Sequence, residues 1–319
     1  MSNRSNAIGR AFEYACIVTL YESISRVRNV EFIKDSTLEN AKNEWESQSL
    51  SSRRNLATGA QAIINTLFEL EPMIVENSDD ILSLKLQKDK KGEAGDVRDI
   101  LLIRSSKNWE IGLSLKHNHF AVKHSRLSMS IDFGNRWYGI KNSKYYWNMI
   151  TPIFDLLKQY KSERKKWSEI PNKTSTIYLP ILNAFKNEIE RVKTRPEVPK
   201  RLVEYLLGKF DFYKVISVDR NKKTLIYSYN LRGMLNKAST VKKSAISLPV
   251  ALLPTRIVAI EMKPNSSNTL EIFLDNGWQF SFRIHNASTN VETSLKFDIQ
   301  IIGMPSNITI FTCEWTQSD

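Results

Sequence analysis

The stretch from residue 93 to residue 128 constrains the fold of this chain more than any other segment. It contains two apolar runs, over 99–104 and 109–116, with a polar turn between them. This pattern predicts two antiparallel strands joined as a hairpin. Asp99 starts the first strand and Lys116 ends the second, so pairing of the strands brings a carboxylate and an amine close together.

An acid beside a lysine suits metal-dependent phosphodiester hydrolysis. The acid holds a divalent cation, and the lysine orients or polarises the attacking water and the scissile phosphate. The chain has no G-x-x-x-x-G-K-[ST] loop, which argues against ATP-driven cleavage. It also has no G-x-S-x-G elbow and no cysteine–histidine arrangement that would support acyl transfer.

The position two residues before the lysine is unusual. Strand alternation places Glu110, Ser114 and Lys116 on one face, and many metal-dependent nucleases carry an acid where this chain has Ser114. Glu110 lies roughly 13 Å from Ser114 at about 3.3 Å per residue, too far to share a cation with Asp99. Another segment must therefore supply the second carboxylate. Glu13 is the leading candidate, and its alternative is an exposed helix glutamate.

Asp96 and Asp99 compete for the role of metal ligand at the start of the hairpin. Asp99 immediately precedes the apolar run, the usual place for a strand-end ligand, so it ranks first. Asp96 is a turn residue or a second ligand. The candidate catalytic residues are thus Asp99, Lys116, Glu13, Asp96 and Ser114, and Asp99 and Glu13 are the expected metal ligands.

Three of the four histidines, His117, His119 and His124, follow the hairpin. They could form a zinc cluster, although such sites usually have a fourth ligand and no cysteine is near. His117-Asn118-His119 also spells the letters of the HNH nucleases, in which the three residues lie far apart in sequence. We favour a DNA-facing surface beside Lys116, and a helix with polar caps is the plain structural alternative. That surface would comprise the histidines, Lys123, Ser125 and Arg126.

A second acid–lysine pattern occurs later in the chain. Glu261-Met262-Lys263 is a literal Glu-x-Lys at the end of an apolar strand. The nearest upstream aspartate at a strand start is Asp219, which leads into a turn instead of a strand. Such a triplet also arises by chance in a chain this charged, so this pair is kept as the alternative active site.

The composition favours a polyanionic partner. The chain has 319 residues, 41% of them hydrophobic, and a formal net charge of +12. Its length predicts one large domain or two lobes, with ample material for a core. The positive charge points to nucleic acid, although a ribosome-sized or membrane-surface partner would also fit.

The cysteines and the N-terminus indicate a reducing compartment. Cys16 and Cys313 lie at opposite ends of the chain and form neither metal-ligand spacing nor a disulfide framework. The first ten residues are polar, and no apolar run approaches the roughly 20 residues of a membrane span. We therefore expect a cytoplasmic protein that neither enters a membrane nor is secreted.

Periodicity predicts helices in three regions. Apolar residues at helical spacing predict helices over 6–27 and 37–71, the second broken near Ser49–Ser52. The region 146–207 is also helical and strongly basic, since residues 155–201 contain 12 Lys and Arg and 6 Asp and Glu. That stretch holds half of the net charge, which suggests phosphate binding by the cluster. A solvated helix face is the alternative.

The remaining regular structure is expected to be strands. One strand is predicted over 81–86, before the hairpin, and the pattern changes to strands after about residue 212. Turn signals such as Asn276-Gly277 separate the later strands. These are predicted over 212–218, 225–229, 257–262, 270–274, 278–284, 295–302 and 308–315.

Several short segments of the chain resemble the PD-(D/E)xK nucleases, and specifically the HaeIII-type type II restriction endonucleases. The Lys-His-Asn-His and Lys-His-Ser-Arg-Leu-Ser blocks carry most of the specificity. This chain has Ser114 where the family has an acidic residue. This difference leaves the set of metal ligands open, but it does not change the expected fold. The matching segments span most of the chain: residues 11–15, 95–99, 114–119, 122–128, 281–287 and 294–298.

The resemblance implies double-strand cleavage of DNA at GGCC with Mg²⁺, or with Mn²⁺ as a substitute. A cognate C5-cytosine methyltransferase would protect the host's own sites, and the enzyme would act as a monomer or homodimer. A site of G·C pairs favours Arg or Lys forks on guanine, for which Arg126, Arg136 and Arg283 are candidates. The expected DNA contacts are His117, Asn118, His119, Lys123, His124, Arg126, Arg136, Arg283 and His285. A structure-specific repair or junction nuclease and a non-catalytic basic nucleic-acid-binding protein are the competing functions.

The resemblance also implies the architecture. We expect an α/β (α+β) restriction-endonuclease-like core, a mixed sheet flanked by helices, with a β-rich C-terminal part. The expected division is a nuclease core over 1–205, with the basic helical insertion at 146–205, and a β-rich lobe over 206–319. That lobe would contact DNA and pack on the core.

Overall fold

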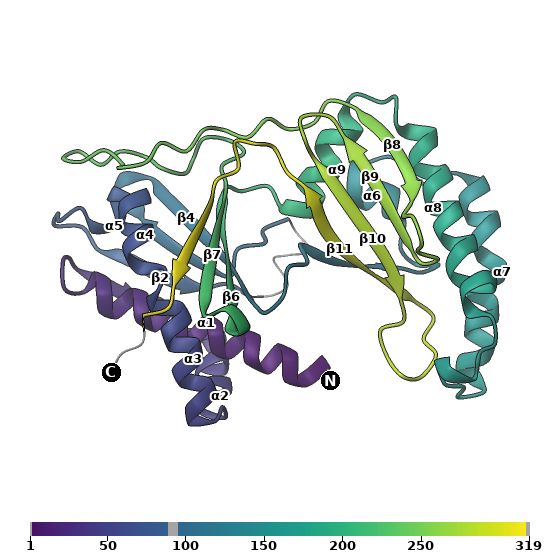
Figure 1. The fold of residues 1–319 in the computed structure, drawn as a ribbon, viewed down its shortest axis with the longest axis horizontal. Coiled ribbons are helices and arrows are strands. Elements are labelled where there is room, and N and C mark those ends of the chain that lie inside the picture. The colour runs from purple at the N-terminus through teal and green to yellow at the C-terminus, as the bar shows by residue number, and fades with distance from the viewer. Residues whose placement is uncertain (1, 89–94, 317–319) are drawn as a thin grey trace. The chain divides into compact units, whose positions relative to one another are not determined.

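The computed structural model describes residues 2–88 and 95–316 (Figure 1). Glu93 and Ala94, at the start of the hairpin stretch, lie outside the described residues. The chain forms two compact units. The first unit comprises residues 1–120, 208–251 and 306–319, and the second comprises residues 121–207 and 252–305.

The first unit is built on a seven-stranded mixed sheet. Its strand order is β1-β2-β3-β4-β6-β7-β12, with parallel pairing between β1 and β2 and between β4 and β6. The predicted hairpin is confirmed, because β3 and β4 pair antiparallel with Ile100 opposite Leu113. The strands are β1 (Val30–Phe32), β2 (Leu82–Leu86), β3 (Ile100–Arg104), β4 (Trp109–His117), β6 (Phe212–Val218), β7 (Lys223–Tyr229) and β12 (Ile310–Glu314).

In the described part of the first unit, five helices precede its hairpin. They are α1 (Ser2–Ile24), α2 (Ser36–Glu46), α3 (Leu50–Gln61), α4 (Ile64–Leu70) and α5 (Pro72–Val75). The predicted break near Ser49 is confirmed, since the Ser49 side chain accepts a hydrogen bond from the Ser52 N–H and caps α3. Helix α1 buries Phe12 and Ala15 in the same core as Leu113 and Leu115 of β4. This packing places the polar edge of α1 beside the hairpin.

The second unit combines an antiparallel sheet with helices on one face. The sheet order is β5-β11-β10-β9-β8. Trp137 of α6 and Phe185 of α8 pack their rings against Phe282 and Phe297 of the sheet. The elements are β5 (Lys123–Leu127), α6 (Phe133–Tyr138), α7 (Lys144–Ser162), α8 (Leu179–Val192), α9 (Glu197–Leu207), β8 (Ile257–Met262), β9 (Thr269–Leu274), β10 (Gln279–His285) and β11 (Leu295–Gly303).

The two units differ from the expected division at residue 205. Strands β6, β7 and β12 lie in the expected lobe 206–319, yet they extend the sheet of the first unit. Strand β5 lies in the expected core 1–205, yet it pairs with β11 of the second unit. Both exchanges come from strand pairings between residues about a hundred or more positions apart, which local sequence patterns do not encode.

No helix in the described part of the chain is long and apolar enough to span a membrane. The mixed α/β architecture with helices flanking sheets agrees with the predicted fold class.

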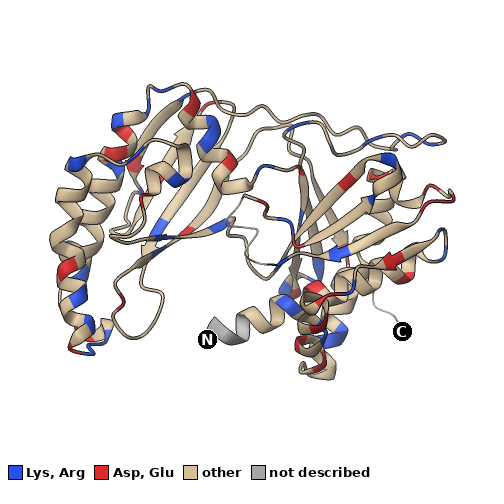
Figure 2. Cartoon of the chain, turned by 180° about the vertical axis from the view of Figure 1, so that it is seen from behind, with Lys and Arg blue, Asp and Glu red and all other residues tan. Residues whose placement is uncertain are grey.

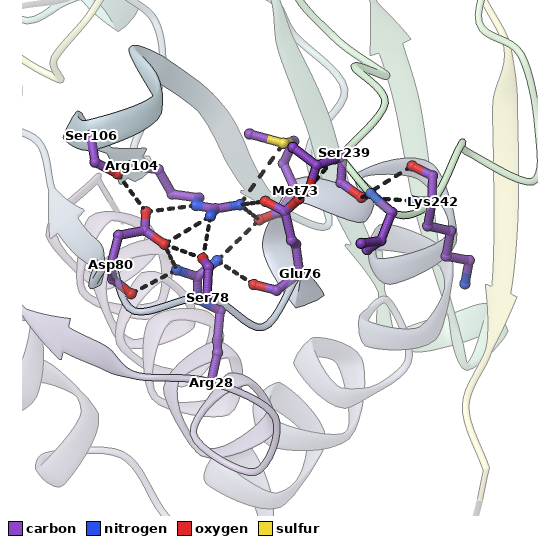
Figure 3. Close-up of polar contacts among 11 residues, drawn as sticks. Arg28, Met73, Glu76, Ser78, Asp80, Arg104, Ser106, Ser239 and Lys242 are labelled. Atoms are coloured by element: carbon purple, nitrogen blue, oxygen red, sulfur yellow. Dashed lines mark hydrogen bonds and ion pairs between the residues drawn. The ribbon is translucent and has the colours of Figure 1, made fainter.

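A buried ionic network lies at the far end of β3 from Asp99, around Arg104 (Figure 3). The Arg104 guanidinium is fully buried and donates to Glu76 at 2.6 Å and to Asp80 at 2.8 and 2.9 Å. Arg28 also donates to Asp80, at 2.7 Å. Because each charge has a partner, the cluster is tolerated in the interior of the first unit.

Acid should weaken this network in a defined pH window. The hydrogen bond from the Thr240 hydroxyl, with help from Arg104, lowers the pKa of Glu76 from 4.5 to about 2. A folded-state pKa below the unfolded value gives stability that is present above pH 4.5 and is lost as the pH falls towards 2. We expect Glu76→Gln to be less stable than wild type at pH 7, with a difference that shrinks below pH 4.5. Urea unfolding at several pH values measures this, and a constant difference would contradict it.

Candidate active site

Asp99 is fixed at the end of the sheet by both neighbouring strands. Its N–H donates to the Leu113 carbonyl at 2.7 Å, and its carbonyl accepts from the Gln87 N–H at 2.8 Å. It thus continues the ladder by one residue before β3 begins. This backbone anchoring holds the Asp99 side chain at the end of the strand, the usual place for a strand-end ligand.

The Asp99 carboxylate and the Lys116 ammonium lie together, as the hairpin predicted. The Lys116 Nζ is 3.5 Å from Asp99 Oδ2 and donates to the Leu115 carbonyl at 2.9 Å. The Leu115 N–H donates to the same Oδ2 at 2.6 Å, and the Ser114 hydroxyl lies 3.4 Å from it. The side chains of Asp99 and Lys116 are 21% and 33% exposed, so solvent can reach both.

Glu13 is a buried carboxyl group in the same neighbourhood. It is 9% exposed and accepts a hydrogen bond from Arg10 at 2.8 Å, so it is not an exposed helix glutamate. Burial, with the negative charge of Asp99 as the next cause, raises the pKa of Glu13 from 4.5 to about 8. The charge of Lys116 acts in the opposite direction. The first helix therefore brings a second carboxyl group into electrostatic range of Asp99 and Lys116.

This donor set fits a hard divalent cation. Two carboxyl groups approach each other in a partly buried place, and their mutual repulsion is one cause of the raised pKa of Glu13. A cation between such groups removes that repulsion, and carboxylate oxygens are the ligands that Mg²⁺ prefers.

Asp96 and Glu110 are both held by one arginine. The Arg98 guanidinium donates to Asp96 at 2.7 and 2.8 Å and pairs with Glu110 at 2.8 Å. Its side chain crosses Gly112, where an added Cβ would lie 2.1 Å from Arg98 Cδ. Asp96 also accepts from Gln87 at 2.8 Å. The arrangement favours the turn-residue interpretation of Asp96 and agrees with the placement of Glu110 away from Asp99.

Lys214 is a second lysine at this site that the sequence interpretation missed. Parallel pairing of β4 with β6 sets Lys214 beside Ser114, and its Nζ donates to the Phe120 carbonyl at 3.0 Å. Burial and then the charge of Lys116 lower the pKa of Lys214 to about 7. A lone lysine inside the otherwise apolar run 212–216 is the signal that could have revealed it.

His117 and Asn118 tie β4 to the start of the β6–β7 turn. His117 Nε2 lies 2.9 Å from Asp219 Oδ2, and the Asn118 side chain accepts from the Asp219 N–H at 3.0 Å. Asn118 has a left-handed backbone, with φ of 53°. Both side chains thus serve the fold of the first unit, whatever further contact they make.

The residues of the alternative sites belong to both units. His117 and His119 belong to the first unit and His124 to the second. Likewise Asp219 lies in the first unit and Glu261-Met262-Lys263 in the second. There the Lys263 ammonium lies 3.6 Å from a carboxylate oxygen of Glu271.

Four predicted DNA contacts share one face of the second unit's sheet. His124 and Arg283 both lie opposite Asp298, and Arg126 and His285 both lie opposite Lys296. Directly opposed residues of antiparallel strands point to the same side. The face formed by His124, Arg126, Arg283, His285, Lys296 and Asp298 is called here the polar face. Lys296 was not predicted, because its neighbours at 295 and 297 mark the strand as core.

Two other predicted contacts lie on the helix side of that sheet. Lys123 donates to the Tyr205 carbonyl at 2.7 Å, and its Nζ lies 3.9 Å from the centre of the Tyr205 ring on α9. Arg136 lies on α6, next to Trp137, which packs on the apolar side of the sheet. These residues are therefore not part of the polar face.

The basic stretch 155–201 forms helices, as predicted, but several of its cations are already paired. Lys165 pairs with Glu163 at 2.7 Å, Arg191 with Glu188 at 2.5 Å and Lys193 with Glu190 at 2.5 Å. Lys and Arg are spread over both units in Figure 2, with Asp and Glu among them. Net charge in sequence thus overstates the positive surface of these helices.

A partly exposed acid–lysine pair at a sheet end, with a buried carboxyl group beside it, suits metal-dependent phosphodiester hydrolysis, the chemistry of the nuclease class. The family model for HaeIII restriction endonuclease matches residues 9–305. The type II restriction enzyme HaeIII of Haemophilus aegyptius is 51% identical over 319 residues, covering 99% of this chain and all of that protein. No solved structure matches the chain. The chain belongs to the HaeIII restriction endonuclease family and is a type II restriction endonuclease.

Proposed function

We propose that this enzyme cleaves both strands of DNA at GGCC, with Asp99, Lys116 and Glu13 as its active site in a PD-(D/E)xK-type core. The contact between Asp99 and Lys116 across the β3–β4 hairpin is the observation that carries the proposal. The GGCC target rests on the likeness to HaeIII-type enzymes, since no residue spacing encodes a base sequence.

Each residue has a distinct task in this proposal. Asp99 and Glu13 would hold Mg²⁺, or Mn²⁺ in its place, which supplies charge that polarises the scissile phosphate and activates the attacking water. Lys116, held by the Leu115 carbonyl, places its ammonium at the phosphate and offsets the negative charge that develops there. Ser114 supplies a hydroxyl beside Asp99 and orients that carboxylate.

Double-stranded DNA is the proposed substrate, bound in part by the polar face of the second unit. A C5-cytosine methyltransferase is the proposed functional partner, and the cytoplasm the proposed compartment. The enzyme would work as a monomer or a homodimer.

A plasmid digest with Mg²⁺ tests the function directly. We expect discrete fragments whose sequenced ends all fall within GGCC. Nicking at junctions or damaged positions would favour a structure-specific repair nuclease instead. Binding without cleavage would favour a non-catalytic DNA-binding protein.

Cleavage should depend on a hard divalent cation. We expect full activity with Mg²⁺ or Mn²⁺ and none in chelator or in Ca²⁺, because Ca²⁺ takes more ligands in a looser geometry. The measurement is the initial rate on a GGCC plasmid after exhaustive chelation and re-addition of each metal. Full activity after chelation would overturn the metal mechanism, and rescue by Zn²⁺ alone would revive a histidine site.

Glu13→Gln should reduce single-turnover cleavage by about a hundredfold, equivalent to about 2.7 kcal/mol of barrier. Loss of one of two anionic ligands weakens metal binding and misaligns the water, and high Mn²⁺ should restore part of the rate. Glu110→Gln is the matched control, because Glu110 pairs with Arg98 instead. If Glu110→Gln is the crippled variant and Glu13→Gln cleaves normally, the second carboxylate comes from the hairpin.

A further inference from the structure

A buried carboxylate lies at the centre of the polar face. Asp298 is 6% exposed, and it stands between His124 on β5 and Arg283 on β10, which are its cross-strand neighbours. A charge is removed from water at such a place only with a compensating partner. Asp298 therefore has a task among the exposed basic side chains around it.

The partner of Asp298 is Arg283. The Arg283 Nη2 donates to Asp298 Oδ2 at 3.1 Å, while the arginine side chain remains 55% exposed. Asp298 Oδ1 is buried and accepts no hydrogen bond from the described residues, and the His124 Nδ1 lies 3.8 Å from it. The Asp298 carboxylate thus binds one nitrogen of the Arg283 guanidinium, and much of the arginine side chain stays exposed.

A second arginine on the same face is held in a similar way. Arg126 Nη1 donates to Glu292 at 3.1 Å and to Ser294 at 2.8 Å, and its side chain is 48% exposed. Strand β11 separates the strands of Arg126 and Arg283, and their positions are offset by two residues. With strands about 4.8 Å apart and about 3.3 Å per residue, the two Cα atoms are about 12 Å apart. That separation does not exceed the width of the major groove, about 12 Å, so both side chains can enter one groove.

Resting on the proposed function, we propose that Arg283 reads guanine in the major groove and that Asp298 is the positioning residue that fixes its guanidinium for that contact. A guanidinium that a carboxylate already holds loses less side-chain entropy than a mobile one when it forms two parallel hydrogen bonds to guanine O6 and N7. The nearby carboxylate also repels phosphate, so the pair favours a base edge over the DNA backbone. Arg126 supplies the companion fork on the same face.

The test separates base recognition from general DNA binding. Wild type, Arg283→Ala, Arg283→Lys and Asp298→Asn are bound to a GGCC duplex and to one with a single G·C pair of the site replaced by A·T, in chelator and over a range of salt. Arg54→Ala, which removes an exposed arginine on α3, is the control for lost charge. The expected result is that Arg283→Ala loses most of the preference for GGCC, about tenfold to a hundredfold.

Two further outcomes distinguish positioning from simple attraction. Arg283→Lys should keep affinity for the altered duplex but lose the preference, because an ammonium has no fork. Asp298→Asn should lower the preference about tenfold, with an unchanged salt slope. A mere phosphate contact would instead weaken both duplexes equally and reduce the salt slope by about one.

The inference is overturned if Arg283→Lys and Asp298→Asn, shown to be folded by thermal melting, keep the wild-type preference. The inference is also overturned if either variant binds both duplexes more weakly by the same factor. If the wild-type enzyme cuts GGCC and these variants still prefer the GGCC duplex to the altered one, only this inference is overturned. A wild type that neither prefers nor cuts GGCC removes the proposed function with it.

Discussion

Lys116→Ala and Asp99→Asn should each abolish cleavage of a GGCC duplex, with a loss of at least about a thousandfold. Each removes a group that acts on charge at the reacting phosphate, where loss of one preorganised donor alone costs about a hundredfold to a thousandfold. Affinity for the duplex should stay close to wild type, because binding is spread over many basic contacts. Single-turnover rates and Kd values measured on the same duplex test both statements.

Lys107→Ala is the matched control for the lysine. Lys107 is exposed in the turn at the other end of the same hairpin, so the substitution removes an equal charge at a distance from Asp99. It should cleave at the wild-type rate. If Lys116→Ala or Asp99→Asn cleaves at nearly the wild-type rate, the active site is elsewhere, and Glu261 and Lys263 should be substituted next.

Arg104→Met should destabilise the protein by about 3–5 kcal/mol, the usual cost of breaking a buried ion pair from one side. The substitution leaves Glu76 and Asp80, whose side chains are 2% and 13% exposed, without their main partner. Arg28 remains to pair with Asp80 and limits the loss.

Urea unfolding at pH 7 gives the free energy of unfolding for this comparison. The double variant Arg104→Met, Glu76→Leu should recover part of the loss, because Glu76 is then no longer a buried carboxylate without its arginine and Asp80 keeps Arg28 as its partner. An average substitution costs about 1 kcal/mol. If the free energy of unfolding of Arg104→Met lies within about 1 kcal/mol of the wild-type value, the network adds little to stability.

The hairpin and the helices were predictable because their signals are local. The two apolar runs within 99–116 and the turn between them indicated the hairpin that joins Asp99 to Lys116. Ser49, a residue type that often caps helices, indicated the start of α3. Glu13 was found by a different route, since the absence of an acid at position 114 required a carboxyl group from elsewhere. Its role in catalysis stays a prediction, while its burial near Asp99 is observed.

The features that were missed depend on pairing between distant segments. Lys214 reaches the site only because β6 lies parallel to β4, and no local pattern states which strands will be neighbours. For the same reason, β5 was expected as a surface segment and is an edge strand of the second unit. Of the predicted DNA contacts, those at alternating positions on paired strands came together, whereas Arg136 did not because it lies on a helix.

The order in which the chain visits its two units has a consequence for synthesis. Strand β6, which carries Lys214, emerges only after the helices of the second unit, and β12 emerges later still. A ribosome must therefore release the chain through residue 314 before the sheet of the first unit can be completed. Such long-range closure also slows folding. A product truncated before residue 212 would lack β6, β7 and β12, three strands of the sheet that bears Asp99 and Lys116, so that sheet would stay incomplete.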